Sequence, residues 1–132
     1  MYILNSKIYI VAKDGCLGKA IIRNLKEKGF ANLVLTTIDL TSKRKVEAFF
    51  EKEKSEYVFL PSIKTGGIFA NNSFPADFIY QNLACDANII NSAFKYKVKK
   101  LLYLGSACSY PKVCSQPIKE EYLLQASLEP TN

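Results

Sequence analysis

Hydrophobic positions follow two different periods along the chain, and the two periods alternate. Four short runs, at residues 7–11, 32–37, 57–60 and 100–104, are rich in β-branched and aromatic residues and have the length of strands. Between these runs, apolar residues recur every three or four positions, which predicts helices with one buried face. The pattern therefore predicts a β-α-β-α-β-α-β chain.

Three helices are expected from the spacing and the flanking residues. Gly29 ends the first helical pattern, and Thr41 or Ser42 can cap the second. A Gly- and Asn-rich stretch, "SIKTGGIFANNSFP", precedes the third pattern and is predicted to be a loop. The expected helices cover residues 17–28, residues 42–53 and residues 76–96.

Nearly continuous apolar strands separated by helices predict a parallel sheet covered on both faces, because each right-handed crossover lays a helix on the sheet. The fold class is therefore an α/β, Rossmann-type doubly wound parallel sheet, and we expect the first strand to lie between the third and the fourth. Ligands of such sheets bind beyond the carboxyl ends of the strands. The loops expected there are residues 12–18, 36–40, 61–68 and 105–110.

Composition narrows the class of protein. The 132 residues have the length of a single domain. No apolar run approaches the roughly 20 residues that span a membrane, so no membrane partner is expected. The net charge of +6 indicates solvated helix faces rather than a nucleic-acid surface, and it favours an anionic ligand. Residues 111–132 hold three of the five prolines, and we expect them to lean on the sheet edge or reach away from it.

Cysteine and histidine usage limits the chemistry. Cys16, Cys85, Cys108 and Cys114 form no C-x-x-C pair, and the sequence contains no histidine, so no metal site is predicted. Free thiols indicate a reducing cytoplasm. Without histidine, any proton transfer must use Cys, Asp, Glu, Lys or Tyr side chains.

The loop after the first strand reads "AKDGCLG" and leads directly into a helical pattern. Gly15 and Gly18 would let backbone amides approach a pyrophosphate, with the positive end of the helix directed at the charge. A tight strand-to-helix turn needs glycine with or without a ligand, so both interpretations stay open.

Several longer stretches carry a family resemblance: "KTGGIFANNSFPADFIYQNL", "VKKLLYLGSACSYPK", "QPIKEEYLL" and "SLEPTN". Together they resemble the GDP-L-fucose synthases, a branch of the extended short-chain dehydrogenases/reductases in the NAD-dependent epimerase/dehydratase family. The resemblance implies an NADP-dependent enzyme that takes the nucleotide sugar GDP-4-keto-6-deoxy-D-mannose, inverts two carbons beside the ketone and reduces the ketone to give GDP-L-fucose. The resemblance also implies that residues 1–132 form a single NAD(P)-binding Rossmann-like domain, incomplete at its C-terminus, and it leaves a homodimer open.

The resemblance assigns roles residue by residue. Ser106 matches a serine that hydrogen-bonds the ketone oxygen, and Cys108 matches the cysteine that transfers protons in epimerisation. The structural alternative for Ser106 is a polar residue at a strand end, and that for Cys108 is a small buried thiol. For Asp39 and Leu40 in the second loop, the structural alternative is a strand end followed by a helix cap. For Lys64 in the third loop, it is a long flexible connection. The cofactor-binding positions implied by the resemblance are Ala12, Asp14, Gly15, Cys16, Leu17, Gly18, Asp39, Leu40, Pro61, Ser62, Ile63 and Lys64.

Departures from the family pattern weaken the expected cofactor site. Ala12 replaces a glycine, and Asp14 and Thr36 replace the two arginines that grip the 2′-phosphate of NADP. Pro61 removes a backbone donor from the third loop. An acid about 4 Å from a phosphate costs on the order of 4 kcal/mol at an effective dielectric near 20, although Lys13 can offset part of it. Weak or lost NADP binding, with little preference over NAD, is the expectation.

The last departure lies at the end of the sequence. In the family, "EPTN" is followed within a few residues by a Tyr-x-x-x-Lys pair and later by the substrate-binding domain, whereas this sequence ends at Asn132. Two hypotheses follow. The chain is the cofactor-binding part of a GDP-L-fucose synthase-like reductase, inactive as these residues alone, or a degenerate paralogue that serves as a binding or interaction module.

Overall fold

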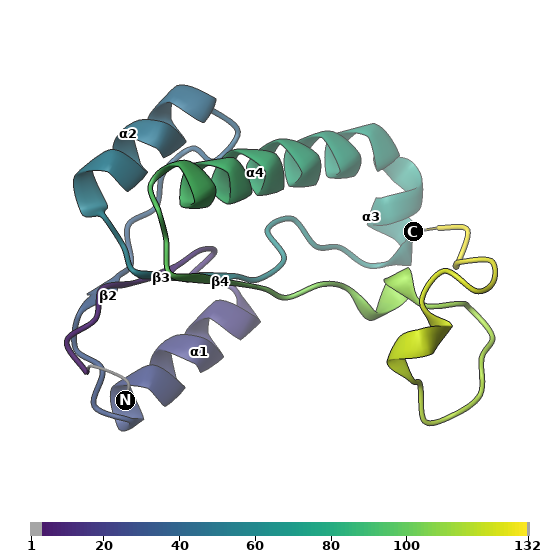
Figure 1. Ribbon diagram of the computed structural model, residues 1–132. Helices are drawn as coiled ribbons and strands as arrows, with labels where there is room; N and C mark the ends of the chain where they lie inside the picture. Colours follow the sequence, from purple (N-terminus) through teal and green to yellow (C-terminus); the bar gives the residue numbers. More distant parts are fainter. Residues whose placement is uncertain (1–3, 132) are drawn as a thin grey trace.

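Four parallel strands form the centre of the computed structural model, which describes residues 4–131. Helices connect the strands in the alternating order that the sequence predicts (Figure 1). In chain order the elements are β1 (Ile8–Ile10), α1 (Cys16–Glu27), β2 (Leu33–Val34), α2 (Lys43–Glu53), β3 (Tyr57–Leu60), α3 (Ile68–Ser73), α4 (Pro75–Lys95), β4 (Lys100–Tyr103), η1 (Ala107–Ser109) and η2 (Glu120–Tyr122).

The strand order is β2-β1-β3-β4, with every pair parallel. The register places Ile8 beside both Leu33 and Tyr57, and Leu60 beside Tyr103. The expectation that the first strand lies between the third and the fourth is wrong, because β1 lies between β2 and β3. The α1 crossover places β2 on one side of β1, and the α2 crossover on the opposite face brings β3 to the other side.

Helices cover both faces of the sheet, as expected for a doubly wound fold. Figure 1 shows α2 and α4 side by side on one face and α1 on the other. The larger core cluster fills the space under α2 and α4, where alternate strand residues meet the two helices; it contains Tyr9, Val11, Val34, Val46, Phe49, Phe50, Val58, Leu60, Ile89 and Ala93. A smaller cluster of Ile8, Ile10 and Leu25 packs under α1.

The predicted second strand, residues 32–37, is too long. Only Leu33–Val34 pairs with β1, because β1 ends at Ile10 and the chain turns away at Ala12. Residues 35–37 therefore lose the neighbour that would extend the ladder. The other three strands and the first, second and last helices lie within one or two residues of the expected bounds.

The predicted loop over residues 62–75 is also wrong in part, because α3 (Ile68–Ser73) forms within it. Gly67 is its N-cap, the Phe74 amide closes its last turn on the Ala70 carbonyl, and Pro75 starts α4. Pro is favoured at the first position of a helix, where its missing N–H has no helical partner. A six-residue helix is too short to show a clear hydrophobic period, so the sequence pattern does not reveal it.

The segment after β4 extends past the carboxyl ends of the strands in Figure 1, so it reaches away from the sheet rather than along its edge. None of the helices among residues 4–131 is long and apolar enough to cross a membrane.

Candidate nucleotide-binding site

A cavity of about 440 Å³ opens at the carboxyl ends of β1, β2 and β3 and is called the first cavity. It lies where strand order reverses around β1, which is the usual ligand position in an open parallel sheet. The structure gathers there most of the expected cofactor positions: Ala12, Asp14, Gly15, Cys16, Leu17, Gly18, Leu40, Pro61, Ser62 and Ile63.

Ala12 has a backbone conformation that favours glycine. Its φ is 50°, in the left-handed region that a side chain disfavours. The Gly15 amide donates to the Ala12 carbonyl at 3.1 Å, which closes the turn. Gly18 is required by the same turn, because an added Cβ would lie 2.4 Å from the Ala12 oxygen. The turn is therefore closed and carries backbone strain at Ala12.

Helix α1 presents its N-terminus to the first cavity without a side-chain cap. Gly15 is the N-cap and offers no side-chain acceptor, so the first amides of the helix remain available to a ligand. Uncapped amides combined with the helix dipole favour a phosphate at this position. These features fit the pyrophosphate of a nicotinamide dinucleotide.

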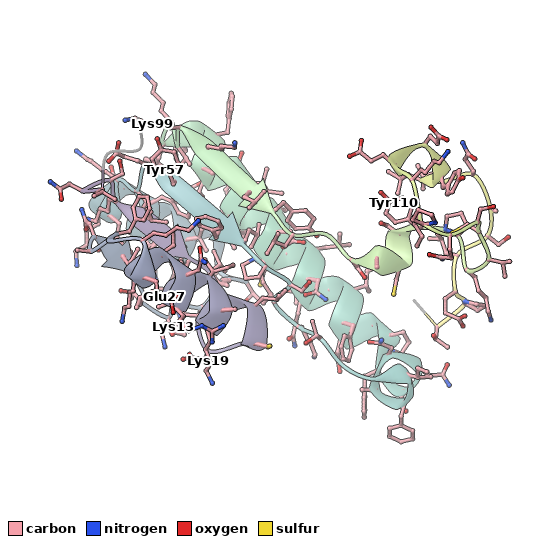
Figure 2. All side chains as sticks on the ribbon, turned by 90° about the horizontal axis from the view of Figure 1, so that it is seen from below. Lys13, Lys19, Glu27, Tyr57, Lys99 and Tyr110 are labelled. Carbon is pink, nitrogen blue, oxygen red and sulfur yellow. The ribbon has the colours of Figure 1, made fainter. Side chains whose placement is uncertain are left out.

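Asp14 lines the first cavity, but its carboxylate is paired with Lys13. The Lys13 Nζ donates to both carboxylate oxygens of Asp14 at 2.8 Å. Figure 2 looks onto the face covered by α1 and shows Lys13 beside this helix. The ion pair lowers the repulsion that Asp14 would exert on a phosphate.

Asp39 does not line the first cavity, in contrast to its neighbour Leu40. Its carboxylate accepts hydrogen bonds from Thr41 Oγ1 at 2.6 Å and from Lys45 Nζ at 3.2 Å, and these bonds, that of Thr41 first, hold the pKa of Asp39 below its usual value. Asn88 of α4 donates to the Leu40 and Thr41 carbonyls at 2.9 and 3.1 Å. Asp39 thus braces the loop that supplies Leu40 to the cavity wall.

A second cavity of about 510 Å³ adjoins the first. The two share Ser62, Ile63 and Thr65 in their linings, so they lie next to each other along the loop that follows β3. The structure brings the predicted Lys64, Ser106 and Cys108 together here, rather than in the first cavity. The remaining lining residues are Gly66, Asn71, Pro75, Phe78, Ile79, Asn82, Leu83, Asp86, Tyr103 and Thr131.

Ser106 begins η1 and fixes the position of Cys108. Its Oγ accepts a hydrogen bond from the Cys108 amide at 3.1 Å, while its own O–H stays free to donate. Both residues are exposed, and Cys108 is a free thiol. The arrangement offers one hydroxyl donor and one thiol on the same wall.

Asn82 of α4 holds the loop that carries Lys64. Its Oδ1 accepts from the Lys64 amide at 2.9 Å and its Nδ2 donates to the Lys64 carbonyl at 3.0 Å. The Lys64 ammonium lies 4.9 Å from the centre of the Phe78 ring, and a Cβ on Gly66 would meet that ring at 2.7 Å. The loop is therefore packed tightly against α4.

Sequence reasoning missed the contribution of α4 to the second cavity. Phe78, Asn82 and Asp86 are spaced four residues apart, so they share one helix face. Asp86 and Tyr103 are hydrogen-bonded, with Oη donating to Oδ2 at 3.0 Å. The sequence does contain a signal for this cavity wall. It is the helical spacing of the polar residues Asn82 and Asp86, followed by Tyr103 at the end of the next strand.

Strand order, uncapped helix and contiguous cavities define a Rossmann-type nucleotide-binding fold. The family model described as NAD dependent epimerase/dehydratase family matches residues 8–132, and the chain belongs to this family. The family assignment and the resemblance to GDP-L-fucose synthases are thus confirmed.

Individual relatives agree with this assignment. The chain is 54% identical to GDP-L-fucose synthase 1 of Arabidopsis thaliana over 97% of its own length, and 48% identical to GDP-L-fucose synthase of Escherichia coli over 96%. It spans about 40% of the length of these curated relatives, 41% and 40% respectively. The structure of a GDP-mannoheptose C4 reductase from Campylobacter jejuni with NADP bound superposes with a TM-score of 0.92 at 45% identity, covering 99% of this chain and 42% of the other.

Proposed function

We propose that this chain is the cofactor-binding part of a nicotinamide-dependent enzyme that modifies a GDP-linked keto sugar. The observation that carries the proposal is the pair of contiguous cavities, because the first begins at the uncapped α1 N-terminus and the second ends at Ser106 and Cys108. Relatives named as GDP-L-fucose synthases and a GDP-mannoheptose reductase support the GDP-sugar class.

In this proposal the dinucleotide extends through both cavities. Gly15, Cys16 and Leu17 hold the pyrophosphate with backbone amides, and Leu40 contacts the adenine. Ser62 and Ile63 form the wall that the cofactor crosses, and a bound reduced nicotinamide supplies the hydride. Of the other predicted cofactor positions, Ala12, Asp14, Gly18, Pro61 and Lys64 line the two cavities, and Asp39 braces the loop that carries Leu40.

Ser106 and Cys108 act at the sugar end of the path. The free Ser106 O–H donates a hydrogen bond to the ketone oxygen, which stabilises the negative charge that develops when an adjacent C–H is deprotonated. The Cys108 sulfur, as thiolate, accepts that proton. The hydrogen bond from the Cys108 amide to Ser106 Oγ holds the backbone that carries the thiol next to the hydroxyl.

The proposed preference between cofactors is small. Asp14 and Thr36 line the first cavity where arginines stand in the family pattern, so the 2′-phosphate of NADP gains no guanidinium partner. The Lys13 ion pair keeps the loop usable by either cofactor. Binding is expected to be weak, with NADH and NADPH close in affinity.

Calorimetric titration with ADP tests the first cavity. Lys13→Glu should abolish ADP binding, because it places two acids at the phosphate loop. Lys19→Glu is the matched control: it makes the same change in net charge on α1, in a residue that does not line the cavity. Equal effects of the two variants, or no ADP binding by the unaltered chain, would contradict the proposal.

A polypeptide of these 132 residues is not expected to produce GDP-L-fucose. The sequence holds no histidine to serve as a general acid, whose loss costs about 10² to 10⁴ in rate. Tyr110 does not replace it, since it lies in the segment beyond the sheet in Figure 2 and is not among the described residues that line the second cavity. NADPH oxidation with GDP-4-keto-6-deoxy-D-mannose above the protein-free control, abolished by Ser106→Ala, would contradict this expectation.

A further inference from the structure

The second cavity contains an acid that the proposed chemistry does not use. Asp86 projects from α4 into the cavity wall and is partly buried. Within residues 4–131 its side chain has one hydrogen-bond partner, Tyr103, and no ion pair with a lysine or arginine. One carboxylate oxygen, Oδ1, is therefore available to a ligand.

Tyr103 orients this carboxylate. Tyr103 ends β4 opposite Leu60, and its hydroxyl crosses from the sheet to α4 to reach Oδ2 of Asp86. The Tyr103 oxygen, having donated its proton to Asp86, can accept a second hydrogen bond. Together the two side chains present adjacent acceptors and no donor.

A wall of acceptors selects its ligand by charge and by hydrogen bonding. A phosphate is repelled by the carboxylate and finds no donor on the pair, whereas a hydroxyl group can donate to it. Hydrogen bonds from a ligand hydroxyl to a carboxylate are charge-assisted and stronger than neutral ones. Burial disfavours the charged form of Asp86 and so raises its pKa. A ligand that donates a hydrogen bond to the carboxylate would stabilise that charged form.

We propose that Asp86 and Tyr103 form a subsite for the hydroxyl groups of a sugar, at the part of the second cavity away from the phosphate loop. The proposal rests on the proposed function, which places the phosphates in the first cavity. The shared chemistry is a sugar hydroxyl, which the second ribose of a dinucleotide or the hexose of a nucleotide sugar can supply.

Calorimetric titration with paired ligands tests the subsite. ADP-ribose differs from ADP by one ribose, and GDP-mannose differs from GDP by one hexose. Asp86→Asn should weaken one sugar-bearing ligand about tenfold, as expected for the loss of a charge-assisted hydrogen bond, while leaving ADP and GDP unchanged. Tyr103→Phe should give a smaller loss for the same ligand. Which ligand responds identifies the source of the sugar.

Asp77→Asn is the matched control, because it removes the same charge from an exposed position of α4 outside both cavities. Thermal stability of Asp86→Asn should be equal to or above that of the unaltered chain, so lost affinity would not reflect unfolding. Unchanged affinity of both sugar-bearing ligands in Asp86→Asn would overturn the subsite even if ADP binds. Failure of ADP to bind the unaltered chain would instead overturn the proposed function, and with it the phosphate position on which the subsite depends.

Discussion

The two cavities are built in different ways. The first is formed by loops at the ends of β1, β2 and β3, with backbone amides at an uncapped helix and with its acid already paired to Lys13. The second is lined by the loop after β3, by side chains of α4 and by residues at and beyond the end of β4, and its acid, Asp86, has no cationic partner among the described residues. Backbone geometry thus dominates the first cavity and side-chain chemistry the second.

This difference has a consequence for substitutions. The first cavity tolerates altered side chains as long as the turn keeps its shape, as Ala12 shows with its φ of 50°. The second cavity depends on the identity of individual side chains, such as Asn82 on the Lys64 loop. Changes in backbone freedom should therefore affect mainly the first cavity, and polar truncations mainly the second.

The largest effect is expected from Gly18→Ala. The added Cβ would lie 2.4 Å from the Ala12 oxygen and 2.8 Å from the Lys13 Cα, so the turn must shift. The free energy of unfolding should fall by about 1–3 kcal/mol, as for overpacked sites, and ADP affinity should fall at least about tenfold. Chemical denaturation and calorimetry measure the two.

Gly67→Ala is the control for this prediction, because a Cβ at Gly67 meets nothing within 4 Å. It should leave ADP affinity unchanged. Equal losses in the two variants would show that the clash at Gly18 does not shape the first cavity.

Asn82→Ala should loosen the second cavity alone. It removes both hydrogen bonds to the Lys64 backbone, which costs about 1–2 kcal/mol for partly buried groups. Hydrogen exchange at the Lys64 amide should speed up, while ADP affinity stays the same. Asn91→Ala, at an exposed position of α4, should change neither. Loss of ADP binding in Asn82→Ala would mean that the two cavities are not separable.

Ala12→Gly should stabilise the chain. Relief of the left-handed strain at Ala12 should raise the free energy of unfolding by about 1–2 kcal/mol. The greater flexibility of glycine in the unfolded chain should lower it again by about 0.5–1 kcal/mol. A net gain of about 0.5–1 kcal/mol is expected in denaturant melts. Ala20→Gly, within α1, should instead destabilise by a similar amount. A loss of stability in Ala12→Gly would contradict the strain assigned to the turn.

The smallest effect concerns the pH dependence of Asp86. Burial raises its pKa in the folded state, so the folded chain holds this proton more tightly than the unfolded chain. The charged form therefore costs stability at neutral pH, and the cost disappears as pH falls through the raised pKa towards the ordinary value. Asp86→Asn should be the more stable protein at neutral pH, and the difference should vanish in acid. A difference of the opposite sign would show that the Tyr103 hydrogen bond outweighs burial.

The sequence was sufficient to predict the parallel sheet and most of the first cavity. Apolar periodicity marks the strands and helices directly, and Gly15 and Gly18 mark the turn by their spacing. The neutralised charge of Asp14 could only be suspected, because two adjacent residues on a loop need not pair. Asp39 was expected at the cofactor, but hydrogen bonds to Thr41 and Lys45 direct its carboxylate into its own loop.

Strand order and the second cavity were harder to predict. The position of β1 depends on which face each crossover uses, which periodicity alone does not encode. The Gly- and Asn-rich composition around the short helix α3 is typical of loops, so the sequence does not predict this helix. Asp86 and Tyr103 are 17 residues apart and belong to different elements, so their contact follows from the docking of α4 on β4. The assignment of individual cofactor and catalytic residues stays a prediction.

We propose that the first cavity binds a dinucleotide without selecting for the 2′-phosphate. The most direct test is calorimetric titration of the chain with NADH and NADPH under identical salt conditions. We expect weak binding of both, with dissociation constants within about fivefold of each other, which corresponds to about 1 kcal/mol. Tight binding of NADPH with NADH at least about a hundredfold weaker would contradict it, because such selectivity requires a cationic partner for the 2′-phosphate.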